Sequence, residues 1–293
     1  DRVIRPSLSV VELIADLGDI DPNVRQAAAQ RLGQLPRVTV VAQAAALVMG
    51  KAQAAESDTR MFSTPSVALD LLVRLDPPRA ESLALEQIDT RDPDLRDTAA
   101  AIVSRLDDGV AMPFLVRALR EWGVDNTAGL RAVMLGLDQG KRAETSEVRA
   151  AVLGVLKLQP LPARNPRFTY ANEHEPPEDG DLYRCWLFRA DACLGLIARH
   201  PFDEANDGVR RCLLIDELRV GGALALARLQ QPDTAQIVRS WLERDKNTEH
   251  RLGLYRALFL VGGDTPADRL AARDMFTATQ APSAAWVEGL RAM

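Results

Sequence analysis

The sequence predicts an all-α protein: a right-handed α-solenoid of about eight antiparallel helix pairs with one long loop insertion. An arginine recurs near the start of a helix in successive units, at intervals of 35, 36, 35, 53, 35 and 32 residues. The apolar residues are mostly Ala, Leu and Val, and aromatics make up only 5%, which suits thin helices that pack closely. No segment shows the two-residue alternation of a strand long enough to predict one.

The first helix pair is the clearest. Apolar residues three and four positions apart predict a helix over 8–18. The next helix begins at Pro22, because Asp21 can cap free N–H groups and proline loses no hydrogen bond at the first helical position. It runs to about Leu35, and Pro36 blocks its continuation.

The same periodicity predicts further helices along the first half of the chain, over 38–54, 60–75, 79–90, 93–106, 111–122, 128–137 and 146–157. Pro65 is expected to kink or restart the helix over 60–75. The phase of these helices predicts that Leu32 and Leu106 are buried.

An insertion interrupts the period. The interval of 53 residues exceeds 35 by about 18, and the extra residues form a Pro-rich acidic segment at 160–181 with five prolines and no helical pattern. We expect one array over 1–293, in which this loop separates the repeats 1–159 and 182–293. The second part is predicted to contain helices over 182–199, 205–214, 217–229, 233–244, 248–261, 266–278 and 284–291.

Two runs carry a resemblance to a known family. DPNVRQAAAQRLG at 21–33 and DPDLRDTAAAIV at 92–103 resemble HEAT repeats, in particular the short bacterial repeats of phycobilisome-lyase-like HEAT proteins, whose fold is armadillo-like. The resemblance implies that the motif's Asp and Arg side chains hydrogen-bond between successive repeats as a structural ladder. The residues at these positions are Asp21, Arg25, Asp92, Arg96, Arg131, Arg184, Arg219 and Arg251.

The inserted loop contains the most unusual polar cluster. Its candidate partner-binding residues are Glu173, His174, Glu175, Glu178, Asp179 and Asp181. Three interpretations stand: a solvated loop tip, a docking site for a basic partner, or oxygen ligands for a divalent cation. The spacing does not match a calcium-binding loop, so we assign no metal site.

The sequence offers no convergent catalytic set and no phosphate-cradling glycine loop, so we expect neither a cofactor nor an enzymatic activity. The three cysteines show no disulfide or zinc spacing and indicate buried thiols in a reducing compartment. We therefore expect a cytoplasmic protein; because the chain begins with Asp1 rather than Met, a processed, exported product is the alternative. No apolar stretch is long enough to span a membrane.

Function is predicted from the surface that such an array presents. An extended concave face, lined mainly by the second helix of each pair, favours a non-catalytic scaffold or adaptor that binds a protein or peptide. One alternative, implied by the resemblance, is a HEAT protein that handles a chromophore like a bilin lyase. Another is a DNA-glycosylase-like, nucleic-acid-binding HEAT protein, which the net charge of −5 disfavours. The sequence leaves the oligomeric state open.

Overall fold

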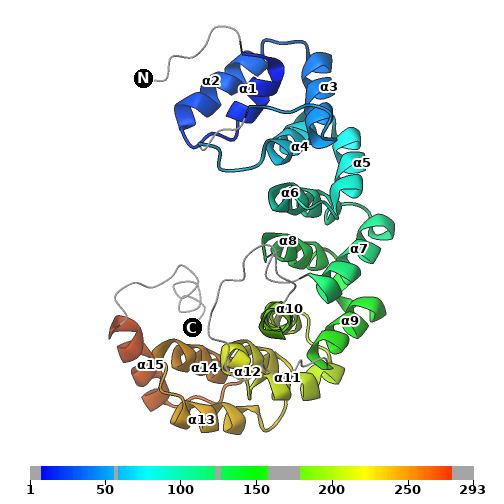
Figure 1. The fold of residues 1–293 in the computed structure, drawn as a ribbon. Coiled ribbons are helices and arrows are strands. Elements are labelled where there is room, and N and C mark those ends of the chain that lie inside the picture. Colours follow the sequence, from blue (N-terminus) through cyan, green and yellow to red (C-terminus); the bar gives the residue numbers. More distant parts are fainter. Residues whose placement is uncertain (1–7, 56–58, 123–126, 158–178, 279–293) are drawn as a thin grey trace. The chain divides into compact units, whose positions relative to one another are not determined.

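The computed structural model describes residues 8–55, 59–122, 127–157 and 179–278, in which helices joined by turns and short connections are the main elements (Figure 1). An isolated antiparallel bridge between Asp19 and Arg60 is the one β pairing within these ranges. No helix in this part of the chain combines the length and the apolarity needed to cross a membrane. The all-α class predicted from the sequence is confirmed for the described residues.

The chain divides into two compact units, residues 1–118 with 125–139, and residues 119–124 with 140–293. This division precedes the segment 160–181 that was expected to separate two runs of repeats. Residues 158–178 lie outside the described part of the chain, as do residues 279–293 with the helix predicted over 284–291.

The helices of the first unit are α1 (Val10–Asp16), α2 (Pro22–Leu32), α3 (Arg37–Val48), α4 (Thr64–Leu75), α5 (Pro77–Gln87), α6 (Pro93–Val103), α7 (Asp108–Glu121) and α8 (Thr127–Leu137). The last three residues of α7 are assigned to the second unit. Within the first unit, α4, α6 and α8 form one layer, with α4 packed against α6 and α6 against α8. The helices α3 and α5 pack against one face of this layer (Figure 1).

The helices of the second unit are α9 (Ser146–Lys157), α10 (Asp179–Arg199), α11 (Asn206–Cys212), α12 (Arg219–Arg228), α13 (Thr234–Arg244), α14 (Thr248–Leu260) and α15 (Pro266–Ala278). Here α12 packs between α10 and α14. The α12–α14 contact is close, because a Cβ at Gly253 would lie 2.3 Å from Cγ1 of Val220. Every predicted helix that falls within the described residues is present; α9 and α15 have the predicted ends, and the ends of the others are shifted.

Local sequence explains where the helices begin. Asp21 caps α2 by accepting from the N–H of Asn23 at 2.8 Å, and proline follows it at the first position, as predicted. Of the two outcomes predicted at Pro65, a kink or a restart of the helix, the structure shows the second, because α4 begins at Thr64. Pro65 lies in the first turn of α4, where its missing N–H removes no helical hydrogen bond.

Burial agrees with the predicted helix phase in the first repeat and departs from it later. Leu32 is buried, as expected. Leu106 is only half-buried, because α6 ends at Val103 and Leu106 falls in the turn that follows. The core otherwise consists of Ala, Leu and Val side chains, in keeping with the composition.

Candidate functional site

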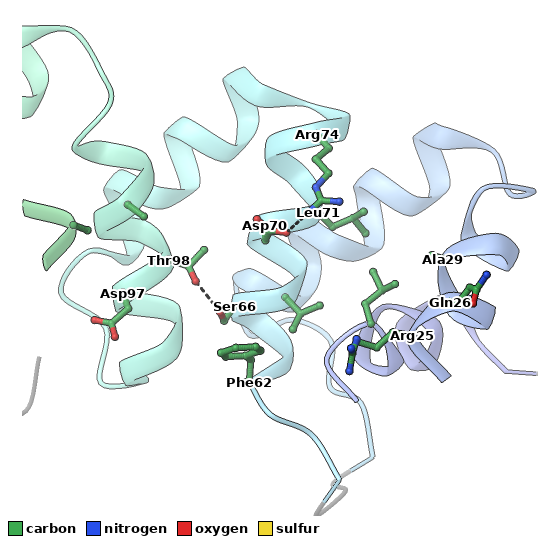
Figure 2. A pocket seen from close by; sticks show the side chains of 14 residues that line it. Arg25, Gln26, Ala29, Phe62, Ser66, Asp70, Leu71, Arg74, Asp97 and Thr98 are labelled. Carbon is green, nitrogen blue, oxygen red and sulfur yellow. Dashed lines mark hydrogen bonds and ion pairs between the residues drawn. The ribbon is translucent and has the colours of Figure 1, made fainter. Parts of the chain in front are cut away.

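A groove of about 760 Å³ opens on the first unit (Figure 2). Side chains from α2, α4, α6 and α8 line it, together with Leu17 after α1 and Phe62 before α4. All of these elements belong to the first unit. The groove therefore follows the second helix of each predicted pair, the helices that the sequence assigned to the inner face.

The groove exists because α2 is set apart from its neighbour. Whereas α4 packs directly against α6, α2 packs against α1 and makes no comparable contact with α4. The apolar side chains of Leu17, Val67 and Leu71 line the resulting space and stay half-buried. Ala29 on the α2 side is exposed. The opening thus has an apolar lining that no described residue covers completely.

The face of α4 forms the floor. Ser66, Asp70 and Arg74 recur at four-residue spacing, so they follow one side of the helix, and Phe62 lines the groove just before it. The hydroxyl groups of Ser66 and Thr98 are 2.7 Å apart and join α4 to α6. At the other end, Arg74 donates to Asp70 at 3.1 Å in an exposed ion pair (Figure 2). Asp70 and Arg74 therefore compensate each other's charge.

Two hydrogen bonds to backbone carbonyl oxygens anchor the side chain of Arg25 in the groove. Its Nη1 donates to the carbonyl oxygen of Asp19 at 2.6 Å and to that of Ile20 at 2.9 Å. Both acceptors precede α2, so the guanidinium is anchored to backbone of its own repeat. Its Nε and Nη2 have no hydrogen-bond partner among the described residues. One edge of the guanidinium is fixed, and the other edge is available.

Asp97 lines the groove on the α6 side, across α4 from Arg25 (Figure 2). Burial raises the pKa of the Asp97 carboxyl above its ordinary value, although the Gly129 N–H and the charge of Arg96 both act to lower it. The negative charge at this position is therefore partly desolvated.

Exposed apolar side chains continue beyond the groove. The N–H of Ile20 donates to the carbonyl of Thr59 at 2.7 Å, and the N–H of Met61 donates to that of Gly18 at 2.8 Å. These bonds hold two connecting segments together, and Ile20, Met61 and Phe62 are each more than half exposed. Large apolar side chains gathered in this way are typical of interaction surfaces.

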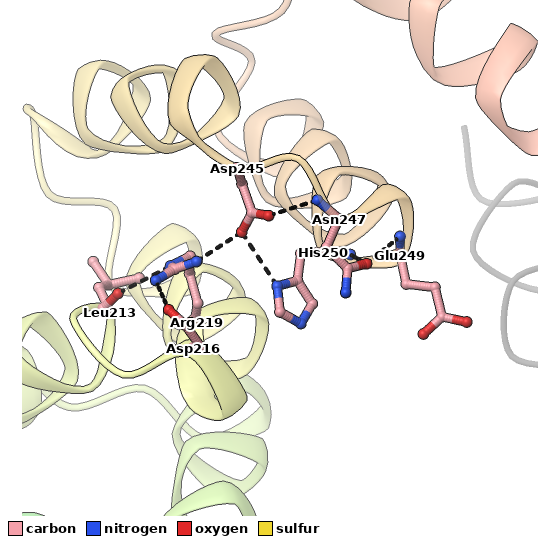
Figure 3. A network of polar contacts seen from close by, with 7 residues as sticks. All are labelled: Leu213, Asp216, Arg219, Asp245, Asn247, Glu249 and His250. Atoms are coloured by element: carbon pink, nitrogen blue, oxygen red, sulfur yellow. Dashed lines mark hydrogen bonds and ion pairs between the residues drawn. The ribbon is translucent and has the colours of Figure 1, made fainter. Parts of the chain in front are cut away.

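The second unit contains a buried polar network (Figure 3). Arg219, at the start of α12, donates to Asp245 at 2.7 Å, and only 9% and 5% of these two side chains are exposed. Asp245 lies between α13 and α14, so the pair connects consecutive repeats. Arg219 also contacts Asp216 and lies 4.1 Å from the centre of the Trp241 ring.

The Asp245 carboxylate has two further hydrogen-bonding partners. It accepts from the N–H of Asn247 at 2.9 Å, and Nδ1 of His250 lies 3.2 Å from its carboxylate. Burial acts to raise the pKa of Asp245, but Arg219, Asn247 and His250 together hold it below its ordinary value. This arrangement stabilises a charged carboxylate inside the fold, and we assign it a structural role.

The other periodic arginines, among them Arg60, which is not one of the predicted ladder residues, differ from one another. Arg60 donates to the carbonyl of Ala55 at 2.5 Å and lies 3.7 Å from Glu12 of α1. Arg131 is exposed, and Nε of Arg251 is buried without a hydrogen-bond partner among the described residues. Asp92 caps α6 through the N–H of Leu95. A uniform inter-repeat ladder therefore stays a prediction.

The predicted acidic cluster falls largely outside the described residues. Glu173, His174, Glu175 and Glu178 belong to the range 158–178, and Asp179 and Asp181 lie in the first turn of α10, whose side chains there are not described. The structure therefore does not test this cluster as a binding site.

Metal and thiol chemistry receive no support from the described residues. No three His, Cys, Asp or Glu side chains gather there in a way that could hold a metal ion. Burial raises the pKa of Cys212 to about 11 and raises that of Cys193 well above its usual range. These two buried thiols stay protonated at neutral pH, and a protonated thiol is a poor nucleophile.

Sequence reasoning named Arg25 and Arg219 as ladder residues but missed the other groove residues and the partners of Arg219 around Asp245. Phe62, Val67 and Leu71 follow the ordinary apolar period of α4, which does not reveal that one side of the helix is left uncovered. The Asn247 cap and the nearby His250 were a usable signal, since an Asn before a helix commonly marks its first turn. Asp245, two residues before Asn247, is then the expected partner of both the Asn247 N–H and the His250 side chain.

No family model and no curated protein matches the sequence. Among solved structures, the complex of CpcE and CpcF of phycocyanin lyase from Nostoc sp. PCC7120 matches over 99% of this chain and 96% of that chain. The identity is 16% and the TM-score is 0.28. At that TM-score the match supports no conclusion about function.

Proposed function

We propose that the protein is a non-catalytic scaffold or adaptor, and that its first unit binds a segment of a partner protein in the groove between α2 and α4. The observation that carries this proposal is that α2 does not pack against α4 as α6 does, which leaves Leu17, Val67 and Leu71 to line an open groove. Burying such side chains contributes about 25 cal/mol for each Å² of apolar surface.

The proposal extends to architecture and location. The helix pairs of both units form one HEAT-like right-handed α-solenoid of about eight pairs over 1–293, in which 160–181 is an inserted loop. The alternation of helices within each unit supports this arrangement. The acidic residues 173–181 add a second docking surface. The three free cysteines support a cytoplasmic location.

Blocking the groove tests the proposal. Ala29→Trp places a bulky side chain at an exposed position that lines the groove, and Ala42→Trp makes the same change at an exposed position of α3 that does not. Each variant and the unmodified chain are used to capture proteins from the native cell lysate. A protein retained by the unmodified chain and by Ala42→Trp, and lost with Ala29→Trp, would support the proposal.

Other outcomes would replace it. A pigment recovered in a groove-dependent way would favour the chromophore-handling alternative. Nucleic acid whose binding falls steeply with salt would favour the DNA-binding one. Proteins bound equally by all three chains would place any docking site elsewhere, and a chain lacking residues 165–180 would then test the acidic segment.

A further inference from the structure

The available edge of Arg25 has a specific chemistry. Because Nη1 donates to the two carbonyl oxygens before α2, the edge that remains consists of Nε and Nη2. Two parallel N–H groups on one side of a guanidinium match the two oxygens of a carboxylate, the bidentate geometry that makes arginine suited to such groups. The anchored edge also limits side-chain freedom, so less conformational entropy is lost when a ligand binds.

The apolar part of the site lines the same groove as Arg25. Val67 and Leu71 are one helical turn apart on α4, and Leu17 lines the space between them and α2. From Ser66 to Arg74 the helix rises about 12 Å, at 1.5 Å for each residue. A ligand that follows this floor can place about two turns of helix, or a few extended residues, within the groove.

The balance of charge selects the class of ligand. The charged side chains in the lining are Arg25, Arg74, Asp70 and Asp97, so the groove as a whole is neutral. Arg74 is paired with Asp70, and Asp97 lies across α4 from Arg25. A polyanion such as a nucleic acid would meet both aspartates, whereas a single carboxylate next to Arg25 meets a cation with two available donors.

We propose that the groove recognises a protein segment in which an Asp or Glu stands within one helical turn of large apolar side chains. The carboxylate pairs with Nε and Nη2 of Arg25, and the apolar side chains cover Leu17, Val67 and Leu71. This inference rests on the proposed function, because it names the chemistry of the partner segment at that same groove.

The first test selects ligands without assuming their sequence. Random 12-residue peptides displayed on phage are bound to the full chain, after peptides that bind Ala29→Trp have been removed. We expect the selected peptides to combine an acidic residue with neighbouring Leu, Ile, Val, Met or Phe. Groove-dependent peptides that lack acids would overturn this inference and leave the proposed function standing. Failure to select any groove-dependent peptide would overturn both.

The second test measures the coupling between Arg25 and the acid. A selected peptide and its twin with the acid replaced by its amide are titrated by fluorescence anisotropy into the unmodified chain and into Arg25→Gln. On the unmodified chain the amide twin should bind about tenfold to a hundredfold more weakly, as expected for a charge-assisted hydrogen-bonded pair. On Arg25→Gln the two peptides should bind alike.

Controls separate recognition from folding. Arg79→Gln removes an exposed arginine of α5, outside the groove, and should leave the difference between the twins unchanged. Arg25→Gln also removes the bonds to two backbone carbonyls, so its thermal unfolding is measured alongside. The comparison of the twins on the unmodified chain does not depend on how the variant folds. Equal affinity of the twins there would overturn the inference.

Discussion

Replacing Asp245 with Asn should destabilise the second unit, because the change removes the buried carboxylate that pairs with the buried, charged Arg219 and leaves this arginine only the exposed carboxylate of Asp216. The two side chains are 5% and 9% exposed, so water cannot take over the lost interaction. Removing one member of a buried pair typically costs 3–5 kcal/mol. The amide can still accept one hydrogen bond, so we expect about 3 kcal/mol, the lower end of that range.

Asp216 provides a matched control. It contacts the same guanidinium, but 75% of its side chain is exposed, and ion pairs in such surroundings contribute about 0–1 kcal/mol. Asp216→Asn should therefore lower the free energy of unfolding by less than about 1 kcal/mol. The two variants remove a carboxylate from the same arginine and differ in its exposure and in the further contacts of Asp245 with Asn247 and His250.

Tryptophan fluorescence makes the measurement specific to this unit. All four tryptophans belong to the second unit, so fluorescence in a urea titration follows its unfolding, while circular dichroism follows the helices of both. For a unit of this size, a loss of 3 kcal/mol corresponds to a midpoint about 6–12 °C lower in a thermal scan. A loss below about 1 kcal/mol for Asp245→Asn, or equal losses for both variants, would refute the reasoning.

Three further predictions concern stability. Gly253→Ala should lower the free energy of unfolding in urea by about 1–3 kcal/mol, because the new Cβ would lie 2.3 Å from Cγ1 of Val220. Gly154→Ala, whose Cβ would meet no atom within 4 Å, should raise the free energy of unfolding by about 0.5–1 kcal/mol. The stability that Asp245 supplies should be constant above about pH 5 and decrease as the pH falls below about 4, because its folded-state pKa is lowered. Free energies of unfolding of the unmodified protein and of Asp245→Asn, measured across about pH 3–7, would test this. A difference between the two proteins that grows on acidification would contradict the prediction. Asp21→Ala should cost about 1 kcal/mol through loss of the α2 cap, and an unchanged denaturation midpoint would show that the cap is dispensable.

The sequence was sufficient for features that depend on neighbouring residues. The start of α2 follows from Asp21 and Pro22, because a cap and a proline act within one turn. The same local reasoning left two outcomes open at Pro65, a kink or a restart, and the structure shows a helix that begins one residue before the proline rather than at 60. A proline is compatible with either place, and the tertiary contacts of α4 decide between them.

The groove could not be predicted, because it depends on contacts between distant residues. The apolar patterns of α2 and α4 are those of ordinary repeat helices, and nothing in them indicates that these two helices stay apart while α4 and α6 pack together. Similarly, the recurrence of Arg25 and Arg219 at equivalent positions suggested one common role. In the structure, Arg25 binds carbonyls of its own repeat and Arg219 binds a carboxylate of the next.

The anchoring of Arg25 to backbone carbonyls has an evolutionary consequence. Every amino acid supplies a carbonyl oxygen, so mutations at Ile20 can change the side chain without removing the acceptor that holds the guanidinium. The exposed side chains of Ile20 and Met61 beside the groove can therefore change in sequence while the position of the Arg25 guanidinium is maintained. Related proteins could acquire different partners by changing Ile20 and Met61 alone, with the charged contact inherited intact.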